Sequence, residues 1–159
     1  MDSPIQKPKM IQDILDKHHI ESKVIEFPQS TKTAQDAANV IGCSVAQIAK
    51  SIIFQTKETE RPVLVLASGA NRVNEKTIEA YIGEKVIKAD ADFIRDVTGF
   101  AIGGVSPIGH KNPITLIFID EDLLTFPEIW AAAGTPNSVF NLKGSDLVKL
   151  TNGKVCSVK

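Results

Sequence analysis

The chain has little of what would cross-link a protein, anchor it in a membrane or hold a metal. Its 159 residues include two cysteines, Cys43 and Cys156, which are too far apart in sequence to suggest a disulfide framework or a metal site. No apolar run approaches the roughly 18 residues of a membrane span. No H-E-x-x-H or similar spacing groups metal ligands. We therefore expect free thiols, no metal and no cofactor.

An excess of charge of one sign is also missing. Lysine and arginine number 18 against 19 aspartate and glutamate residues, for a net charge of −1. Extended binding to nucleic acid needs many cationic contacts with phosphates. We therefore expect no DNA partner, but the composition does not exclude a local contact with one nucleic-acid end. The polar segment MDSPIQKPKMIQDILDKHH has no apolar signal-peptide core, which predicts a cytoplasmic protein that does not bind membranes.

What is present is an ordinary globular composition, with 43% hydrophobic and 23% charged residues in a length suited to one domain. The hydrophobic periodicity predicts alternating helices and strands, and so an α/β fold of mixed α+β type with helices flanking a sheet. We expect helices over 9–19, 34–41, 74–82, 90–98 and 145–150, a short helical turn after Ser44, and strands over 24–27, 51–56, 62–67, 114–120, 128–133, 138–142 and 154–158.

The segment GFAIGGVSPIGHKNP, residues 99–113, is unusually rich in glycine and proline. It departs from a nucleophile elbow because Pro107 stands where a backbone N–H must donate to the oxyanion. It is not a P-loop, since His110 stands where that motif requires the phosphate-binding lysine. It leads into Pro113 and a strand, whereas a dinucleotide fingerprint opens a helix. These three classes of site are excluded.

A site built from the backbone remains. Glycines at 103, 104 and 109 permit positive φ and close approach, and Pro107 stiffens the segment. Main-chain groups of such a loop can bind an anion, an ester carbonyl or a hydroxyl. The alternative is a tight connector between strands, and the spacing alone does not separate the two interpretations.

Several segments, taken in order, resemble the YbaK/prolyl-tRNA synthetase-associated domain family, the free-standing relatives of the editing domain inserted in bacterial prolyl-tRNA synthetases. The similarity extends from about residue 20 to the C-terminus, and we expect one editing domain over 1–159 whose first 20 residues, an N-terminal helix, lie outside its strongest part. The matching residues are Thr33 with AQDAANVIGCS, Gln47–Phe54, Thr98-Gly99-Phe100, Gly103–Gly109, the strand ending at Asp120, and Ala132-Ala133-Gly134.

The resemblance implies a central, mixed, partly barrel-like sheet and hydrolysis of the ester bond in wrongly charged tRNA. The chain would be a trans-acting aminoacyl-tRNA deacylase for tRNA-Pro or a similar tRNA carrying a small amino acid, with the substrate's own ribose hydroxyl assisting. The catalytic residues implied are Lys50, Gly103 and Gly104. Those implied for substrate binding are Thr33, Ser51, Val105, Ser106, Pro107, Ile108, Gly109, His110 and Gly134.

Several alternatives stay open. Lys50 is equally typical of a solvated lysine at a strand end, and His110 of a solvated turn. The chain could instead be a non-catalytic module that binds a charged tRNA end, or an interaction partner of prolyl-tRNA synthetase or another synthetase. Alanine, cysteine, serine, threonine and 2-aminobutyrate are all handled by relatives and are not separated here. No segment resembles an anticodon-reading domain, so we expect tRNA identity to be read weakly at the acceptor stem or supplied by a partner.

Overall fold

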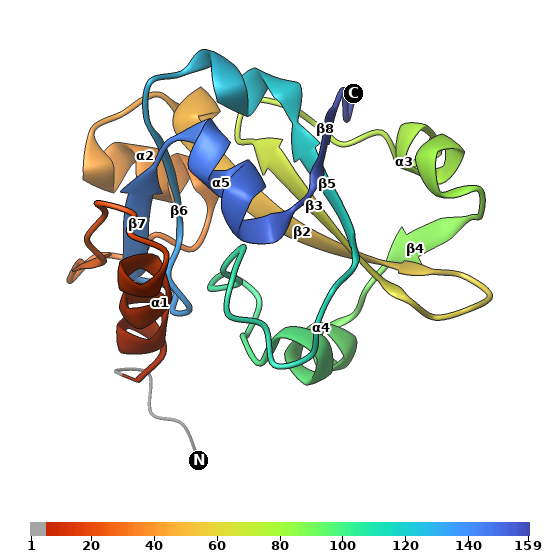
Figure 1. Ribbon diagram of the computed structural model, residues 1–159, viewed down its shortest axis with the longest axis horizontal. Coiled ribbons are helices and arrows are strands. Elements are labelled where there is room, and N and C mark those ends of the chain that lie inside the picture. The colour runs from red at the N-terminus through yellow and green to blue at the C-terminus, as the bar shows by residue number, and fades with distance from the viewer. Residues whose placement is uncertain (1–5) are drawn as a thin grey trace.

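A mixed eight-stranded sheet forms the centre of the computed structural model, which describes residues 6–159 (Figure 1). The order along the sheet is β1-β7-β6-β2-β3-β5-β8, with β4 paired to β2 outside this path. Pairing is antiparallel except for β2 with β6, β3 with β5 and β5 with β8. The strands are β1 (Ile25–Glu26), β2 (Ile48–Thr56), β3 (Pro62–Ser68), β4 (Val86–Lys88), β5 (Leu116–Asp120), β6 (Ile129–Ala132), β7 (Ser138–Leu142) and β8 (Lys154–Cys156).

Five α-helices and two short 3-10 helices surround the sheet in the described part of the chain. Side chains of Thr33, Asn74 and Asp90 accept hydrogen bonds from the first turns of three of these helices. The helices are α1 (Gln6–Lys17), α2 (Ala34–Ile41), α3 (Glu75–Ile82), α4 (Ala91–Thr98) and α5 (Gly144–Thr151), with the 3-10 helices η1 (Val45–Gln47) and η2 (Glu121–Thr125). The mixed α/β fold with a central sheet is therefore confirmed.

The predicted elements are present, but several boundaries differ. Helix α1 begins and ends earlier than the expected 9–19, β2 begins three residues before the expected 51, β5 begins two residues after the expected 114, and β8 ends two residues before the expected 158. The last helix begins at Gly144 and not at Ser145, because the Asp146 carboxylate accepts from the Lys143 amide at 3.0 Å and fixes an earlier start. The strand predicted over 24–27 is present but shrinks to β1, which lies at the edge of the sheet and pairs with β7. Strand β4 and helix η2 were not predicted, since each is too short to show a periodic pattern.

Strand β2 has a partner along all of one side and only at the two ends of the other. It pairs with β3 from Ala49 to Gln55. On its other side β6 pairs with Ile48 and Ala49, and β4 pairs from Phe54 to Thr56. No strand therefore pairs with Lys50–Ile52 on that side, where β6 and β4 diverge, and the Ala89 amide after β4 donates to the Ile53 carbonyl at 3.2 Å.

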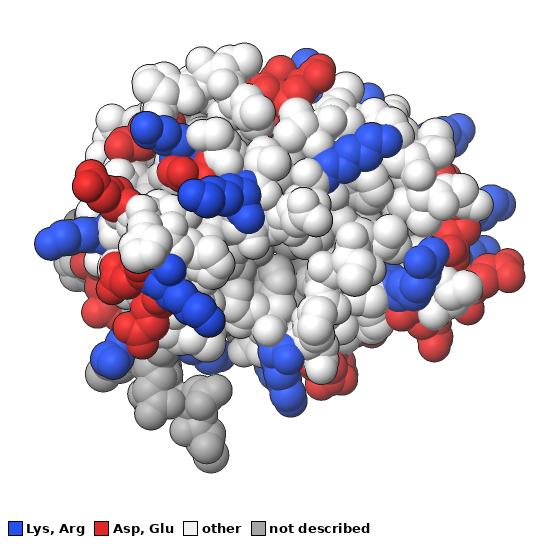
Figure 2. All heavy atoms as spheres, in the orientation of Figure 1, with Lys and Arg blue, Asp and Glu red and all other residues white. Residues whose placement is uncertain are grey.

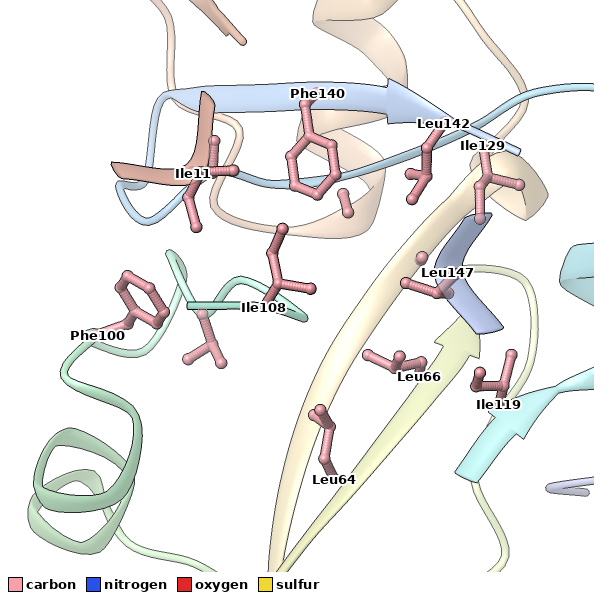
Figure 3. Close-up of a cluster of buried hydrophobic side chains, with 14 of the residues drawn as sticks. Ile11, Leu64, Leu66, Phe100, Ile108, Ile119, Ile129, Phe140, Leu142 and Leu147 are labelled. Atoms are coloured by element: carbon pink, nitrogen blue, oxygen red, sulfur yellow. The ribbon is translucent and has the colours of Figure 1, made fainter. Parts of the chain in front are cut away.

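The core lies on both faces of β3 and β5, as expected for a strand that is apolar on both sides. Leu64 and Leu66 face the larger cluster, while Val63 and Val65 face the smaller one. Figure 3 shows Ile11 from α1, Phe140 from β7 and Ile108 directed into the same larger cluster. The segment around Ile108 is thus held by core packing as well as by its own turns.

Both cysteines are free, as predicted. No helix between residues 6 and 159 combines the length and the apolar character needed to cross a bilayer. Within the same residues, no group of three or more His, Cys, Asp or Glu side chains is placed to hold a metal ion.

Candidate functional site

Two other loops meet the glycine-rich loop, which we define as residues 103–109. A Cβ built on Gly103 would lie 2.5 Å from Cγ of Lys32, and one built on Gly104 would lie 2.9 Å from the backbone of Thr135. The Thr31 amide donates to the Pro136 carbonyl at 2.7 Å, which ties the other two loops together. The structure therefore brings the segments before Thr33 and after Gly134 to the predicted site.

The glycines in this loop are required by geometry. Gly103 has φ of 92°, a region that side chains rarely adopt. At Gly104 any side chain would meet the backbone of Thr135, which cannot rotate away as a flexible side chain can. The Gly103 amide has no acceptor among residues 6–159 and is partly exposed, so it can donate to a ligand.

Most of the loop is turned into the protein. Residues 104–108 are buried, and the Ser106 hydroxyl accepts from the Ile108 amide at 3.3 Å. Val105 and Ile108 belong to the larger core cluster. A ligand therefore reaches this loop at Gly103 or at Gly109, and the side chains in between hold its shape.

His110 follows the C-terminal end of the glycine-rich loop and contacts its backbone. Its Nε2 lies 2.8 Å from the Ser106 carbonyl, to which the neutral ring donates when the proton is on that nitrogen. Its ring makes an edge contact with Phe100, with centroids 6.3 Å apart. Burial lowers the pKa of His110 below its usual value, and the bond to Ser106 opposes this only in part. The neutral form is therefore the one that the fold favours.

Lys50 is half-buried and rests on a neutral partner. Its ammonium donates to the main-chain carbonyl of Asn71 at 2.8 Å. Burial lowers the pKa of Lys50, while the negative charge of Asp120 works in the opposite direction. Asp120 is fully buried and accepts from the Ser68 amide and from the Asn71 side chain, at 3.0 and 2.8 Å.

Lys50 and Ser51 leave β2 on opposite faces. Ser51 is paired with Leu66, which faces the larger core, whereas Lys50 is paired with Ala67, which faces the smaller one. Because Val105 and Ile108 also belong to the larger core, Ser51 lies on the face of the sheet against which the glycine-rich loop packs. The Ser51 hydroxyl is buried and has no hydrogen-bond partner.

Not all the predicted site residues are therefore brought together. Among residues 6–159, no hydrogen bond joins Lys50 to the glycine-rich loop. Thr33 acts as the N-cap of α2, its hydroxyl accepting from Asp36 at 3.0 Å. Gly134 has φ of 97°, and a Cβ there would press on the Phe100 ring at 3.0 Å.

Sequence reasoning missed Lys32, Asn71 and Thr135. Thr135 and Lys32 were each next to a residue that the resemblance singled out, so adjacency could have suggested them. Asn71 carried no such signal, because its role depends on the end of β3 meeting the end of β5.

A cavity of about 380 Å³ opens between α1 and the glycine-rich loop. Its walls include the side chains of Met10 and Phe100 and the backbone around Gly99 and Gly109, with Lys7 and Lys111 also lining it. Helix α1 thus forms one wall of a cavity next to the predicted site, although the first 20 residues lie outside the strongest part of the family resemblance. Figure 2 shows this face hollowed between α1 and α4, with cationic side chains at the margins of the hollow.

The family model described as "Aminoacyl-tRNA editing domain" matches residues 28–150. The chain therefore belongs to the aminoacyl-tRNA editing domain family, and the resemblance inferred from its motifs is confirmed.

The chain is also similar to individual proteins over most of its length. It is 31% identical to the protein YwhH of Bacillus subtilis (strain 168) over 135 residues, which cover 85% of each chain. It is 25% identical over 150 residues to EbsC of Enterococcus faecalis (strain ATCC 700802 / V583), whose name proposes a Cys-tRNA(Pro)/Cys-tRNA(Cys) deacylase, with 91% of this chain and 89% of that one covered. A crystal structure described as a proposed trans-editing enzyme for prolyl tRNA synthetase superimposes with a TM-score of 0.89 and 39% identity, over 100% and 99% of the two chains.

Proposed function

We propose that the chain is a trans-acting aminoacyl-tRNA deacylase that hydrolyses the ester of mischarged tRNA. The observation that carries this proposal is the match to a structure described as a proposed trans-editing enzyme, at 39% identity over 100% of this chain and 99% of the other. The glycine-rich loop supports the same proposal, since Gly103 and Gly104 occupy positions that no side chain can share.

The reaction makes modest demands on the protein. Water adds to the ester carbonyl, the bond from that carbon to the ribose oxygen breaks, and the free amino acid and the tRNA hydroxyl leave. An aminoacyl ester is already activated, so the enzyme mainly orients the water and stabilises the oxyanion. One well-placed oxyanion donor contributes roughly 100- to 1,000-fold in rate. A catalytic triad is not required.

We assign the oxyanion-donor role to the Gly103 amide. Gly103 and Gly109 are the partly exposed residues of the loop, and neither amide has an acceptor among the described residues. We choose Gly103 because it is one of the catalytic residues that the family resemblance implies, whereas Gly109 lies against α1. The ribose hydroxyl of the substrate would assist the attack, as the family resemblance implies. Ser106, Pro107 and Ile108 would act by holding the loop in shape, since all three are buried.

Lys50 would stabilise negative charge near the ester or the terminal phosphate. To reach a ligand held by the loop, its ammonium must leave the Asn71 carbonyl and cross to the other face of the sheet, on the side where no strand pairs with Lys50–Ile52. A lysine stem is long and flexible enough for such a movement. The buried, unpartnered hydroxyl of Ser51 is the candidate contact for the amino-acid side chain.

A second candidate is a non-catalytic module that binds an aminoacylated end. The observation that favours it is the position of Lys50, whose bond to Asn71 keeps the ammonium away from the loop. The names of the relatives point to tRNA-Pro carrying a small amino acid as the ligand for either function, with a prolyl-tRNA synthetase as the partner.

One experiment separates the two candidates. A panel of tRNA-Pro and other tRNAs, each charged with alanine, cysteine, serine, threonine or 2-aminobutyrate, is incubated with the protein, and the loss of the amino acid is followed. The deacylase hydrolyses at least one small-residue ester and spares Pro-tRNA-Pro, and Lys50→Ala lowers the rate of hydrolysis by roughly 100-fold. Survival of every ester together with measurable tRNA binding would establish the binding module.

A further inference from the structure

The cavity between α1 and the glycine-rich loop combines apolar walls with two cations. Lys7 and Lys111 come from segments far apart in sequence, and both contact the same turn at the end of α4. The Lys7 ammonium donates to the Gly99 carbonyl at 2.9 Å, and a Cβ built on Gly99 would lie 3.4 Å from Cβ of Lys111. The cavity volume of about 380 Å³ lies within the range of small-molecule sites.

Neither cation is neutralised by a carboxylate in the described part of the chain, where the ion pairs involve Lys9, Arg61, Arg95 and Lys159. An ammonium carries three donors, so the bond from Lys7 to Gly99 leaves two donors free. The Phe100 ring lies 5.8 Å from that ammonium and Met10 is 37% exposed, which adds apolar surface beside the charges.

The cavity borders the glycine-rich loop at the end opposite Gly103. Gly109 lines it and ends the loop whose other end is Gly103. A Cβ at Gly109 would lie 3.0 Å from Ile11 and 3.1 Å from Met10, so α1 is packed directly on this part of the loop. A third lysine, Lys32, covers Gly103 at the opposite end. A single strand that reached both exposed ends of the loop would thus meet a lysine at each end.

We propose that this cavity binds a phosphate-linked nucleotide of the single-stranded 3′ end of the tRNA, with Lys7 and Lys111 contacting the phosphate and Met10 contacting the sugar or base. The proposal rests on the proposed function for the identity of the ligand. It assigns to the N-terminal helix a role in binding the nucleotides that precede the ester.

The test uses the trinucleotide 5′-CCA-3′ as the probe. Amide chemical shifts of Gly99 and Gly109 are followed as it is added to the isotopically labelled protein, with adenosine and inorganic phosphate as separate probes. We expect shifts at both glycines, an affinity at least roughly tenfold lower in the double variant Lys7→Gln/Lys111→Gln, and a shallower salt dependence of binding, because each phosphate contact in a single strand contributes a slope of about −0.7.

Matched variants exclude a purely structural effect. Lys9→Gln removes an exposed charge from the same helix, where Lys9 pairs with Asp13 at 3.8 Å, and should leave the affinity unchanged. Lys111→Gln alone removes an exposed side chain that makes no bond within the described residues, so its effect on binding is measured on a stable protein. Lys7→Arg should retain the binding that Lys7→Gln loses.

The outcomes also separate this proposal from the deacylase function. If mischarged tRNA is hydrolysed, the double variant should raise KM with little change in kcat. An unchanged KM, an unchanged trinucleotide affinity or shifts confined to other residues would overturn the nucleotide site and leave the deacylase standing. Equal affinity for inorganic phosphate would also overturn it. Lysine-dependent trinucleotide binding by a protein that hydrolyses no ester would overturn the deacylase alone.

Discussion

Two loops of this molecule differ in whether their backbone amides have hydrogen-bond acceptors within the protein. The turn between β2 and β3, residues 57–61, is fully exposed, yet the Glu60 amide donates to the Thr56 carbonyl and the Arg61 amide donates to the Thr56 hydroxyl. The glycine-rich loop is mostly buried, yet the Gly103 amide has no acceptor among the described residues. An exposed turn can leave its donors to water, whereas a donor left free beside a packed loop is available for a ligand.

The largest effect is expected from a side chain at Gly104. Gly104→Ala places a Cβ against the Thr135 backbone at 2.9 Å, so the loop must shift. We expect a loss of about 1–3 kcal/mol in the free energy of unfolding, as for other overpacked sites, and a fall in deacylation of at least roughly 100-fold. Chemical denaturation and single-turnover hydrolysis measure the two effects.

The control for this change is Gly83→Ala. Gly83 has φ of 88° but open space around it, so the alanine costs only the strain of that conformation, about 1 kcal/mol, and leaves hydrolysis intact. Equal losses of activity in the two variants would show that the loop has no special role.

The next effect compares two lysines of the same hairpin. Lys50→Ala should lower deacylation by roughly 100-fold, on the scale of one electrostatic contact with the transition state. The stability should hardly change, since a half-buried cation is removed from a neutral acceptor. Lys57→Ala, in the exposed turn, should change neither quantity. Hydrolysis at the wild-type rate by Lys50→Ala would restore the interpretation of Lys50 as a structural lysine.

A smaller effect concerns pH. Because the pKa of His110 is lowered in the folded protein, the unfolded state binds more protons as the pH falls below about 6.5. Stability is then fully present above that pH and decreases on acidification towards the lower pKa of the folded state, with a slope of at most about 1.4 kcal/mol per pH unit. His110→Gln should reduce this slope between pH 7 and 5. Unfolding curves with the same pH dependence in both proteins would contradict the assignment.

The smallest stability effect is expected at Ser51. Its buried hydroxyl has no partner, so Ser51→Ala should leave the free energy of unfolding unchanged or raise it by up to about 1 kcal/mol. If Ser51 contacts the amino-acid side chain, the preference among small-residue esters should change at the same time. Ser44→Ala, which removes a satisfied cap, should lower stability by about 1 kcal/mol and leave the preference unaltered.

The sequence predicted local features better than the relations between distant ones. Capping residues such as Thr33 and Asn74 and the glycines after the helices set most boundaries, since each acts within a few residues of itself. The hairpin of β2 with β3 follows from their adjacency in the sequence, whereas the pairing of β2 with β6 and β4 could not be predicted in this way, because those strands are distant in the chain.

The same limit applies to the candidate site. The glycines of the loop were identified from sequence, since a bare backbone is itself a signal. The direction of Lys50 depends on the pairing of β2 with β3, and its bond to Asn71 depends on the turn that follows β3. The wall that α1 adds beside Gly109 was not predicted, because the first 20 residues lie outside the strongest part of the resemblance.

The acceptor that holds Lys50 also affects how a substrate would compete for it. An incoming anion must displace the ammonium from an uncharged carbonyl and not from a bonded carboxylate, so no ion pair has to break before the new contact forms. The Lys50 ammonium can therefore move to an anionic partner at a low cost in free energy. Binding of the substrate should weaken steadily with added salt.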